Sequence, residues 1–331
     1  MFYKKTFLIT GAAGFIGSHM VDYLLKKKYF VIGIDNLKNG SLENIKHNFK
    51  NNNFLFLKKD LLKDKINLKK KVDFILHFAG IGEVIPSIEK PLFYIEQNVI
   101  GTTKLLEWAR SVKVKKFVYA ASSSCYGLND KKISENEKIS IEHPYALSKF
   151  LGEHVALSYG KIYNIKVNSI RIFNAYGPRV RSSSNYGAVF GVFFKQKISG
   201  KPLTVIGSGN QKRDYVYVTD VCSAFYKCAL SNYENEIFNL GTGNPQKINT
   251  LVKILNAKKI TIPWRPGEPK VTWANINKIK KYLNWKPKIS FEHGVKVMLK
   301  KISYWKLAPL WTRSTINKAT KNWFTIFNER I

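Results

Sequence analysis

Tyr145 and Lys149 stand four residues apart in a stretch with helical character, so both side chains project from one face of a helix. A phenol has a pKa of about 10 and is a poor base at neutral pH, but a nearby ammonium group stabilises the phenolate and lowers that pKa. Tyr145 is therefore a candidate general acid and base. Ser122, just after the apolar run 117–121, could share a hydrogen bond with the same substrate oxygen. Because a Tyr-x-x-x-Lys spacing is common by chance, its meaning depends on the elements around it.

Three glycines near the N-terminus predict a phosphate-binding turn. In residues 7–17, FLITGAAGFIG, an apolar run leads into Gly11, Gly14 and Gly17, and a helical pattern follows from Ser18. In such a strand–turn–helix unit, Gly11 permits the tight turn and Gly14 lets the backbone approach a pyrophosphate, while Gly17 allows close packing of helix on strand. The pyrophosphate then lies against free N–H groups at the helix N-terminus.

Asp35 ends the next apolar run, residues 30–35, eighteen residues after Gly17. Its carboxylate is placed to accept hydrogen bonds from the adenosine ribose and would repel a 2′-phosphate, which favours NAD over NADP. The glycines and Asp35 together predict an NAD site rather than a glycine turn with a purely structural role. The positive nicotinamide ring would add to the effect of Lys149 on Tyr145.

Apolar runs alternate with helical patterns in the first half of the chain. Further strands are expected at residues 54–58, 72–77, 117–121 and 167–173, and helices at 98–110 and from Pro144. This alternation predicts an α/β fold with a Rossmann-type doubly wound parallel sheet, whose carboxyl edge binds ligands. We expect an NAD-binding domain over residues 1–178, with return segments at about 214–243 that include a strand at 237–240.

From about Arg179 the chain is rich in glycine, serine, asparagine and aromatic residues. We expect a smaller C-terminal α/β substrate domain built from residues 179–213 and 244–331. The tail from Ser303 carries Trp305, Trp311, Trp323, Phe324 and Phe327 among lysines. A helix packed on the second domain explains this tail more plainly than an amphipathic membrane anchor.

Composition limits the remaining possibilities. The 331 residues suffice for one large α/β domain and a smaller one. No run reaches the roughly 18 uncharged apolar residues that a membrane span needs, and no cleavable signal is apparent, so we expect a cytoplasmic protein. Cys125, Cys222 and Cys228 have no metal-ligand spacing, and their odd number fits a reducing compartment. We expect them to be core residues and expect no metal site.

The chain is strongly basic, with 55 lysines and arginines against 22 acidic residues and a formal net charge of +33. Such a charge requires nucleic acid and anionic membranes to be considered as partners. The lysines are spread along the whole chain, however, which favours solvated surface lysines and no nucleic-acid partner. The positive field would also speed the capture of an anionic substrate.

Several motifs, in order along the chain, resemble those of the extended short-chain dehydrogenase/reductases, in particular the nucleotide-sugar epimerases and dehydratases. They are TGAAGFIG from Thr10, HFAG from His77, SSSCYG from Ser122, YALSK from Tyr145, RIFNAYGPR from Arg171, KRDYVYVTD from Lys212 and RPGE from Arg265. Together they cover nearly the whole chain, and they are more specific for the family than for the reaction.

The resemblance implies a set of NAD-binding residues. They are Gly11, Gly14, Phe15, Ile16, Gly17, Asp35, Asn36, Asp60, Leu61, Phe78, Ala79, Gly80, Asn98, Tyr145, Lys149 and Phe173. Among them, Asp60 and Leu61 would hold the adenine, Asn98 would contact the middle of the cofactor, and Lys149 would bind the nicotinamide ribose.

The resemblance also implies a nucleotide-sugar substrate. Its expected contacts are Ser122, Ser124, Tyr145, Asn174, Arg213, Arg265 and Glu268. Arg213 and Arg265 would clamp the pyrophosphate, because each guanidinium makes forked, charge-assisted hydrogen bonds, and Glu268 would hold the nucleoside ribose. The alternative for either arginine is an ordinary surface ion pair.

Ser123 and Ser124 narrow the choice of reaction. Similar 4,6-dehydratases carry Asp and Glu at these positions, and similar sugar-acid decarboxylases keep a glutamate at the second. The remaining groups suffice for 4-epimerisation, in which Tyr145 takes the 4-hydroxyl proton while hydride leaves C4 for NAD and then returns to the other face of the keto sugar. We expect a UDP-hexose 4-epimerase with tightly bound NAD, in which the small Thr272 leaves room for an N-acetyl group.

Alternatives stay open at this point. Another nucleotide-sugar epimerase, a decarboxylase or a dehydratase would share the fold, and a non-catalytic NAD-binding protein is a different class. The base is open because Ile206 offers no aromatic ring to stack on uracil, so dTDP, GDP and CDP sugars remain candidates. The resemblance further implies a homodimer, paired through helices at about residues 98–110 and 145–159.

Overall fold

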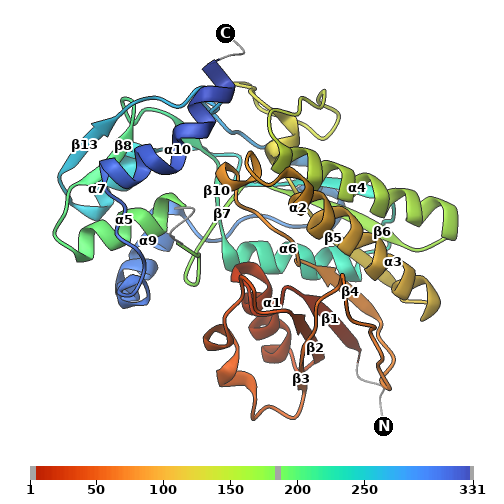
Figure 1. The fold of residues 1–331 in the computed structure, drawn as a ribbon. Helices are drawn as coiled ribbons and strands as arrows, with labels where there is room; N and C mark the ends of the chain where they lie inside the picture. The colour runs from red at the N-terminus through yellow and green to blue at the C-terminus, as the bar shows by residue number, and fades with distance from the viewer. Residues whose placement is uncertain (1–4, 183–187, 329–331) are drawn as a thin grey trace.

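The computed structural model describes residues 5–182 and 188–328, and in them a seven-stranded parallel sheet lies between helices (Figure 1). The strand order is β11-β6-β5-β4-β1-β2-β3. The strands are β1 (Thr6–Thr10), β2 (Phe30–Asp35), β3 (Phe54–Lys58), β4 (Phe74–His77), β5 (Lys116–Ser122), β6 (Val167–Ile172) and β11 (Glu236–Leu240). The doubly wound α/β fold expected from the sequence is confirmed.

The strands form where the sequence is continuously apolar, because a sheet covered on both faces buries both sides of each strand. All residues of β1, β4, β5 and β6 are buried. The bounds of β2 and β3 equal the expected ones, whereas β4 begins at Phe74 rather than at Val72. Asp73 precedes β4, and its carboxylate accepts a hydrogen bond from the Thr6 amide (2.8 Å).

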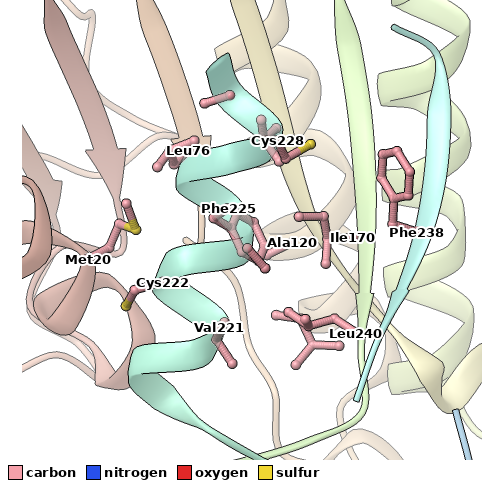
Figure 2. Close-up of a cluster of buried hydrophobic side chains, with 14 of the residues drawn as sticks. Met20, Leu76, Ala120, Ile170, Val221, Cys222, Phe225, Cys228, Phe238 and Leu240 are labelled. Atoms are coloured by element: carbon pink, nitrogen blue, oxygen red, sulfur yellow. The ribbon is translucent and has the colours of Figure 1, made fainter. Parts of the chain in front are cut away.

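Helices α1 (Phe15–Lys26) and α6 (Val218–Leu230) cover one face of the sheet, and α3 (Gly101–Ser111) and α4 (Pro144–Tyr163) cover the other. In Figure 2, Val221, Phe225 and Cys228 of α6 lie toward the strand residues Leu76, Ala120, Ile170, Phe238 and Leu240, whereas Cys222 lies on the side of α6 toward Met20 of α1. The three cysteines are free and buried, so they are core residues as expected. Burial raises the pKa of the Cys228 thiol to about 12.

The helix expected over residues 98–110 begins earlier than expected. α2 (Pro91–Ile95) continues through a π-helical turn, Glu96–Ile100, into α3. Such turns are rare and often lie at functional sites. This one carries Asn98, whose side chain holds the wall of the cleft described below.

Short strand pairs organise the C-terminal part of the chain. They are β7 (Asn174–Tyr176) with β10 (Tyr215–Tyr217), β8 (Leu203–Ile206) with β13 (Lys259–Ile262), and β9 (Lys212–Arg213) with β12 (Gln246–Lys247). The helices here are α5 (Val189–Ile198), α7 (Ile248–Leu255), α8 (Asn277–Leu283), α9 (Phe291–Lys300) and α10 (Arg313–Asn328). The domain boundaries stay a prediction.

The C-terminal tail forms a helix against the substrate side, as expected. Trp305, Trp311 and Ile316 are buried in the hydrophobic core that also holds Phe190 of α5 and Leu251 of α7. Among the helices of the described ranges, none combines the length and the apolar character that crossing a bilayer requires.

Candidate active site

The glycine turn after β1 leaves no room for side chains. Gly11 has a φ of +68°, and a Cβ on it would lie 2.8 Å from the amide nitrogen of Ala79. A Cβ on Gly17 would overlap the carbonyl oxygen of Gly11. The N-cap of α1 is Gly14, which supplies no side-chain oxygen to the first turn. The backbone N–H groups there suit an incoming anion, so the turn fits a dinucleotide pyrophosphate.

A cleft of about 510 Å³ runs from this turn along the carboxyl edge of the sheet. Of the residues expected to bind NAD, the cleft is lined by Gly11, Gly14, Phe15, Ile16, Gly17, Asp35, Asn36, Asp60, Leu61, Phe78, Ala79, Gly80, Tyr145, Lys149 and Phe173. The expected sugar-binding residues Ser122, Ser124 and Asn174 line the same cleft. One cleft therefore brings together groups that lie far apart in the sequence.

Asp35 ties the end of β2 to the glycine turn. Its Oδ2 accepts a hydrogen bond from the Ala13 amide (3.0 Å), and its Oδ1 accepts one from the Leu37 amide (2.8 Å). Burial raises the pKa of Asp35, and these two hydrogen bonds oppose that rise. A carboxylate has room for further donors on its two oxygens, so Asp35 can also accept from a ribose.

Asn98 is the expected cofactor residue that does not line the cleft. Its Oδ1 accepts from the Ile81 amide (2.7 Å), while its Nδ2 donates to the Ile81 carbonyl (3.0 Å) and to Ser148 Oγ (2.9 Å). The side chain thus joins the loop after β4 to α4. A direct contact of Asn98 with the cofactor stays a prediction.

Tyr145 and Lys149 enter the cleft from the first turns of α4. Pro144 occupies the first helical position, where its missing N–H costs nothing. The ring of His143 caps the helix, with Nδ1 accepting from the Ala146 amide (3.2 Å), and it stacks on the Tyr145 ring at 5.9 Å. Burial lowers the pKa of His143 to about 4, so the ring is a neutral acceptor at pH 7.

Burial dominates the protonation of the two candidate catalytic groups. It raises the pKa of the Tyr145 phenol, and a hydrogen bond with Ser122 opposes the rise. It lowers the pKa of Lys149 to about 7, and Glu153 opposes that shift. The lowered phenol pKa expected from Lys149 is therefore not produced by the protein's own groups, because desolvation outweighs them. The charge of the nicotinamide would favour the phenolate when NAD is bound.

Ser122 ends β5 and its Oγ donates to Ser124 Oγ (3.0 Å). The same oxygen accepts from the Ser124 amide (3.2 Å), which closes the turn after the strand. Since Ser122 also bonds Tyr145, the three hydroxyl groups form a connected set at the cleft wall. A substrate hydroxyl placed there meets groups that can both donate and accept.

A second cavity of about 290 Å³ holds the expected diphosphate and ribose residues. Arg213 Nη2 lies 2.9 Å from Glu268 Oε1, and Arg265 Nη1 lies 4.0 Å from Glu268 Oε2. This Oε2 is buried and makes no hydrogen bond. The two cavities share Asn174, Ala175, Val180 and Ala188, so they meet beside β7.

Thr272 acts on Asn174 and does not line either cavity. Its Oγ1 donates to Asn174 Oδ1 (2.7 Å) and accepts from the Asp214 amide (3.1 Å). Because Asn174 lines both cavities, Thr272 lies directly behind their shared wall, and the expectation that its small size leaves room for an N-acetyl group stays a prediction. Ile206 does line the second cavity.

Sequence reasoning missed two parts of the site. The loop after β4 contributes Glu83 and Val84 to the cleft, and the C-terminal helix contributes Ile316, Ala319 and Thr320 to the second cavity. The spacing of apolar residues in the tail from Ser303 predicts a helix with a buried face. It does not predict which part of the molecule that face covers.

Residues 8–298 match the family model described as GDP-mannose 4,6 dehydratase. The chain belongs to this family. The resemblance to nucleotide-sugar epimerases within the extended short-chain dehydrogenase/reductases is thereby confirmed. Within the family, a putative UDP-glucose 4-epimerase of Methanocaldococcus jannaschii is 36% identical over 87% of this chain and 95% of its own length.

Solved structures of nucleotide-sugar epimerases have the same fold as this chain. The UDP-glucuronic acid 4-epimerase of Bacillus cereus, in complex with UDP-glucuronic acid and NAD, superposes with a TM-score of 0.84 at 32% identity, over 91% of this chain and 99% of its own. The UDP-N-acetylglucosamine 4-epimerase of Methanobrevibacter ruminantium gives 0.83 at 30% identity, over 90% and 99%. These relatives are 4-epimerases of UDP sugars, and the first was crystallised with the cofactor that the glycine turn fits.

Proposed function

We propose that this protein is an NAD-dependent 4-epimerase of UDP-activated hexoses. The observation that carries the proposal is the placing of Ser122, Tyr145 and Lys149 in one cleft, between the glycine turn and the cavity with Arg213 and Arg265. A nucleotide sugar that reaches from the arginines past the shared wall would bring its hexose to Tyr145. The names of the relatives support the same reaction.

Each residue has a role in this reaction. The glycine turn and Asp35 hold NAD, which when bound supplies reversible oxidation at the sugar C4. Tyr145 accepts the proton of the 4-hydroxyl and later returns it. Ser122 bonds the same oxygen and fixes its direction.

The substrate's nucleotide is held at the other end of the site. Arg213 and Arg265 bind the diphosphate, and the free Oε2 of Glu268 accepts from a ribose hydroxyl. The hexose is then tethered at one end only, so the keto sugar can turn and offer its other face to the cofactor. Ser123 and Ser124 stand where similar dehydratases carry acids, which favours epimerisation over elimination.

The test is incubation of the purified protein with UDP-glucose, UDP-N-acetylglucosamine and UDP-glucuronate, with the product sugars separated and identified. We expect the C4 epimer of at least one, without added cofactor, because NAD is regenerated in each cycle. dTDP, GDP and CDP sugars serve as comparison for the base. Recovery of a decarboxylated or dehydrated product, or of unchanged sugars throughout, would reject the proposal.

We also propose a cytoplasmic location.

A homodimer formed through α3 and α4 is a further part of the proposal. Large apolar side chains are exposed on α4 and on the helical segment that leads into α3, namely Leu147 and Ile162 on the first and Leu92 and Ile100 on the second. Sedimentation at micromolar concentration is expected to give twice the monomer mass, and Leu147→Glu is expected to give the monomer. Leu307→Glu, at a residue that is 96% exposed on the C-terminal segment, is the control that should leave the dimer intact. A monomeric wild-type protein would contradict this part.

A further inference from the structure

The C-terminal helix α10 lies beyond residue 298, where the family match ends. In Figure 1 it runs across the top of the molecule from the side of α5 toward the side of α2 and α4. Its buried residues Ile316, Thr320, Trp323 and Phe327 recur at helical spacing, while Lys318 faces solvent. An amphipathic helix buries its apolar face against another part of the molecule, and α10 lays part of this face along the second cavity.

α10 is anchored to both sides of the site. Toward the NAD-binding side, Asn322 Nδ2 donates to Glu89 Oε1 (2.8 Å), and the Trp323 ring lies 6.0 Å from the ring of His143. Toward the substrate side, Trp323 Nε1 donates to the Pro266 carbonyl (2.7 Å). Pro266 directly follows Arg265, and His143 stacks on Tyr145. Trp323 thus joins the loop of the expected diphosphate clamp to the start of the catalytic helix.

The inner face of α10 is a wall of the cavity. Ile316, Ala319 and Thr320 line the same space as Arg213, Arg265 and Glu268. The Thr320 hydroxyl donates to the Ile316 carbonyl within the helix (2.9 Å), so the wall offers apolar surface and no unused donor. Such a wall selects by shape, because it limits the width of what lies against it.

We propose that α10 is a strap that closes the nucleotide-sugar cavity, and that Ala319 at its centre is the residue whose small side chain leaves room for the substrate. The inference rests on the proposed function, because it takes the cavity to be the nucleotide-sugar site. Ala319 is the smallest side chain on the inner face, so a larger one there occupies space that the substrate needs. α10 contacts both the NAD-binding side and the substrate side of the cavity. A nucleotide sugar bound beneath α10 therefore restricts the motion of this helix.

The experiment compares Ala319→Trp with Lys318→Trp, which adds the same ring one residue away on the solvent face. Affinity for UDP-N-acetylglucosamine and UDP-glucose is measured by titration calorimetry. We expect Ala319→Trp to raise the dissociation constant at least tenfold with the NAD content unchanged, and Lys318→Trp to leave both at the wild-type value. Equal affinities of the two variants would overturn the proposal.

A second measurement needs no variant, in case Ala319→Trp does not fold. Hydrogen exchange of the wild-type protein is recorded with and without the UDP sugar, and the amides of residues 313–328 are expected to exchange several-fold more slowly in the complex. A bound sugar that leaves this exchange unchanged would overturn the strap. Binding without turnover, together with slowed exchange, rejects the proposed reaction and supports the strap, whereas a wild-type protein that binds no UDP sugar rejects both.

Discussion

Tyr145→Phe is expected to reduce the epimerisation rate by about 10²–10⁴-fold, the usual contribution of a positioned acid and base. The ring contacts with His143 and Tyr94 (5.9 and 6.5 Å between centroids) do not involve the hydroxyl, so the fold and the cleft should persist. The measurement is kcat with the preferred UDP sugar, together with the NAD content of the purified variant, which should equal that of the wild type.

Tyr163→Phe is the matched control, because it removes a phenol from the other end of the same helix, where the side chain is 44% exposed. It should leave kcat unchanged. A Tyr145→Phe variant that retains a third or more of wild-type turnover would remove Tyr145 from proton transfer. Loss of NAD from that variant would instead assign the phenol to cofactor binding.

Glu153→Ala is expected to lower the free energy of unfolding by about 3–5 kcal/mol, the usual cost of removing one partner of a buried ion pair. Glu153 and Arg171 are 3% and 4% exposed at the side chain, and Arg171 Nη2 lies 2.6 Å from Glu153 Oε1. The pair ties α4 to β6, one turn after Lys149. Burial opposes the charge of Arg171, yet its carboxylate partner keeps the pKa of Arg171 above the usual value.

Denaturant unfolding measures this loss. The double variant Glu153→Met, Arg171→Met should recover part of it, since no charge is then left buried without a partner. Glu292→Ala breaks an exposed ion pair with Lys296 on α9 and should leave the midpoint unchanged. A loss for Glu153→Ala as small as that for Glu292→Ala would show that Arg171 finds another partner.

The sequence alone predicted the site residues at positions where the backbone or the helix spacing admits few residue types. Gly11 and Gly17 meet backbone atoms where a side chain would collide, and the Tyr145 and Lys149 spacing places both on one helical face. The contact of Gly17 with Gly11 and the Tyr145–Lys149 spacing lie within one motif each, and the positive φ of Gly11 is a property of its own turn. The continuous apolar runs likewise predicted the parallel strands to within a few residues.

The sequence was insufficient where function depends on which neighbour a side chain meets. The motifs single out Asn98 and Thr272, but the hydrogen bonds of Asn98 with Ile81 and of Thr272 with Asn174 follow only from the fold. The phenol pKa of Tyr145 depends on burial, which no spacing reveals. The part played by α10 depends on a contact between segments more than fifty residues apart, Trp323 with Pro266.

The pairing of Glu268 with Arg213 has a consequence for selectivity among anions. Before any diphosphate arrives, a carboxylate already sits 2.9 Å from Arg213 and 4.0 Å from Arg265. If the proposed function holds, an incoming phosphate has to compete with this internal anion, whereas a nucleotide also brings ribose hydroxyls that give Glu268 a new partner. We therefore expect the cavity to prefer a nucleoside diphosphate to inorganic phosphate.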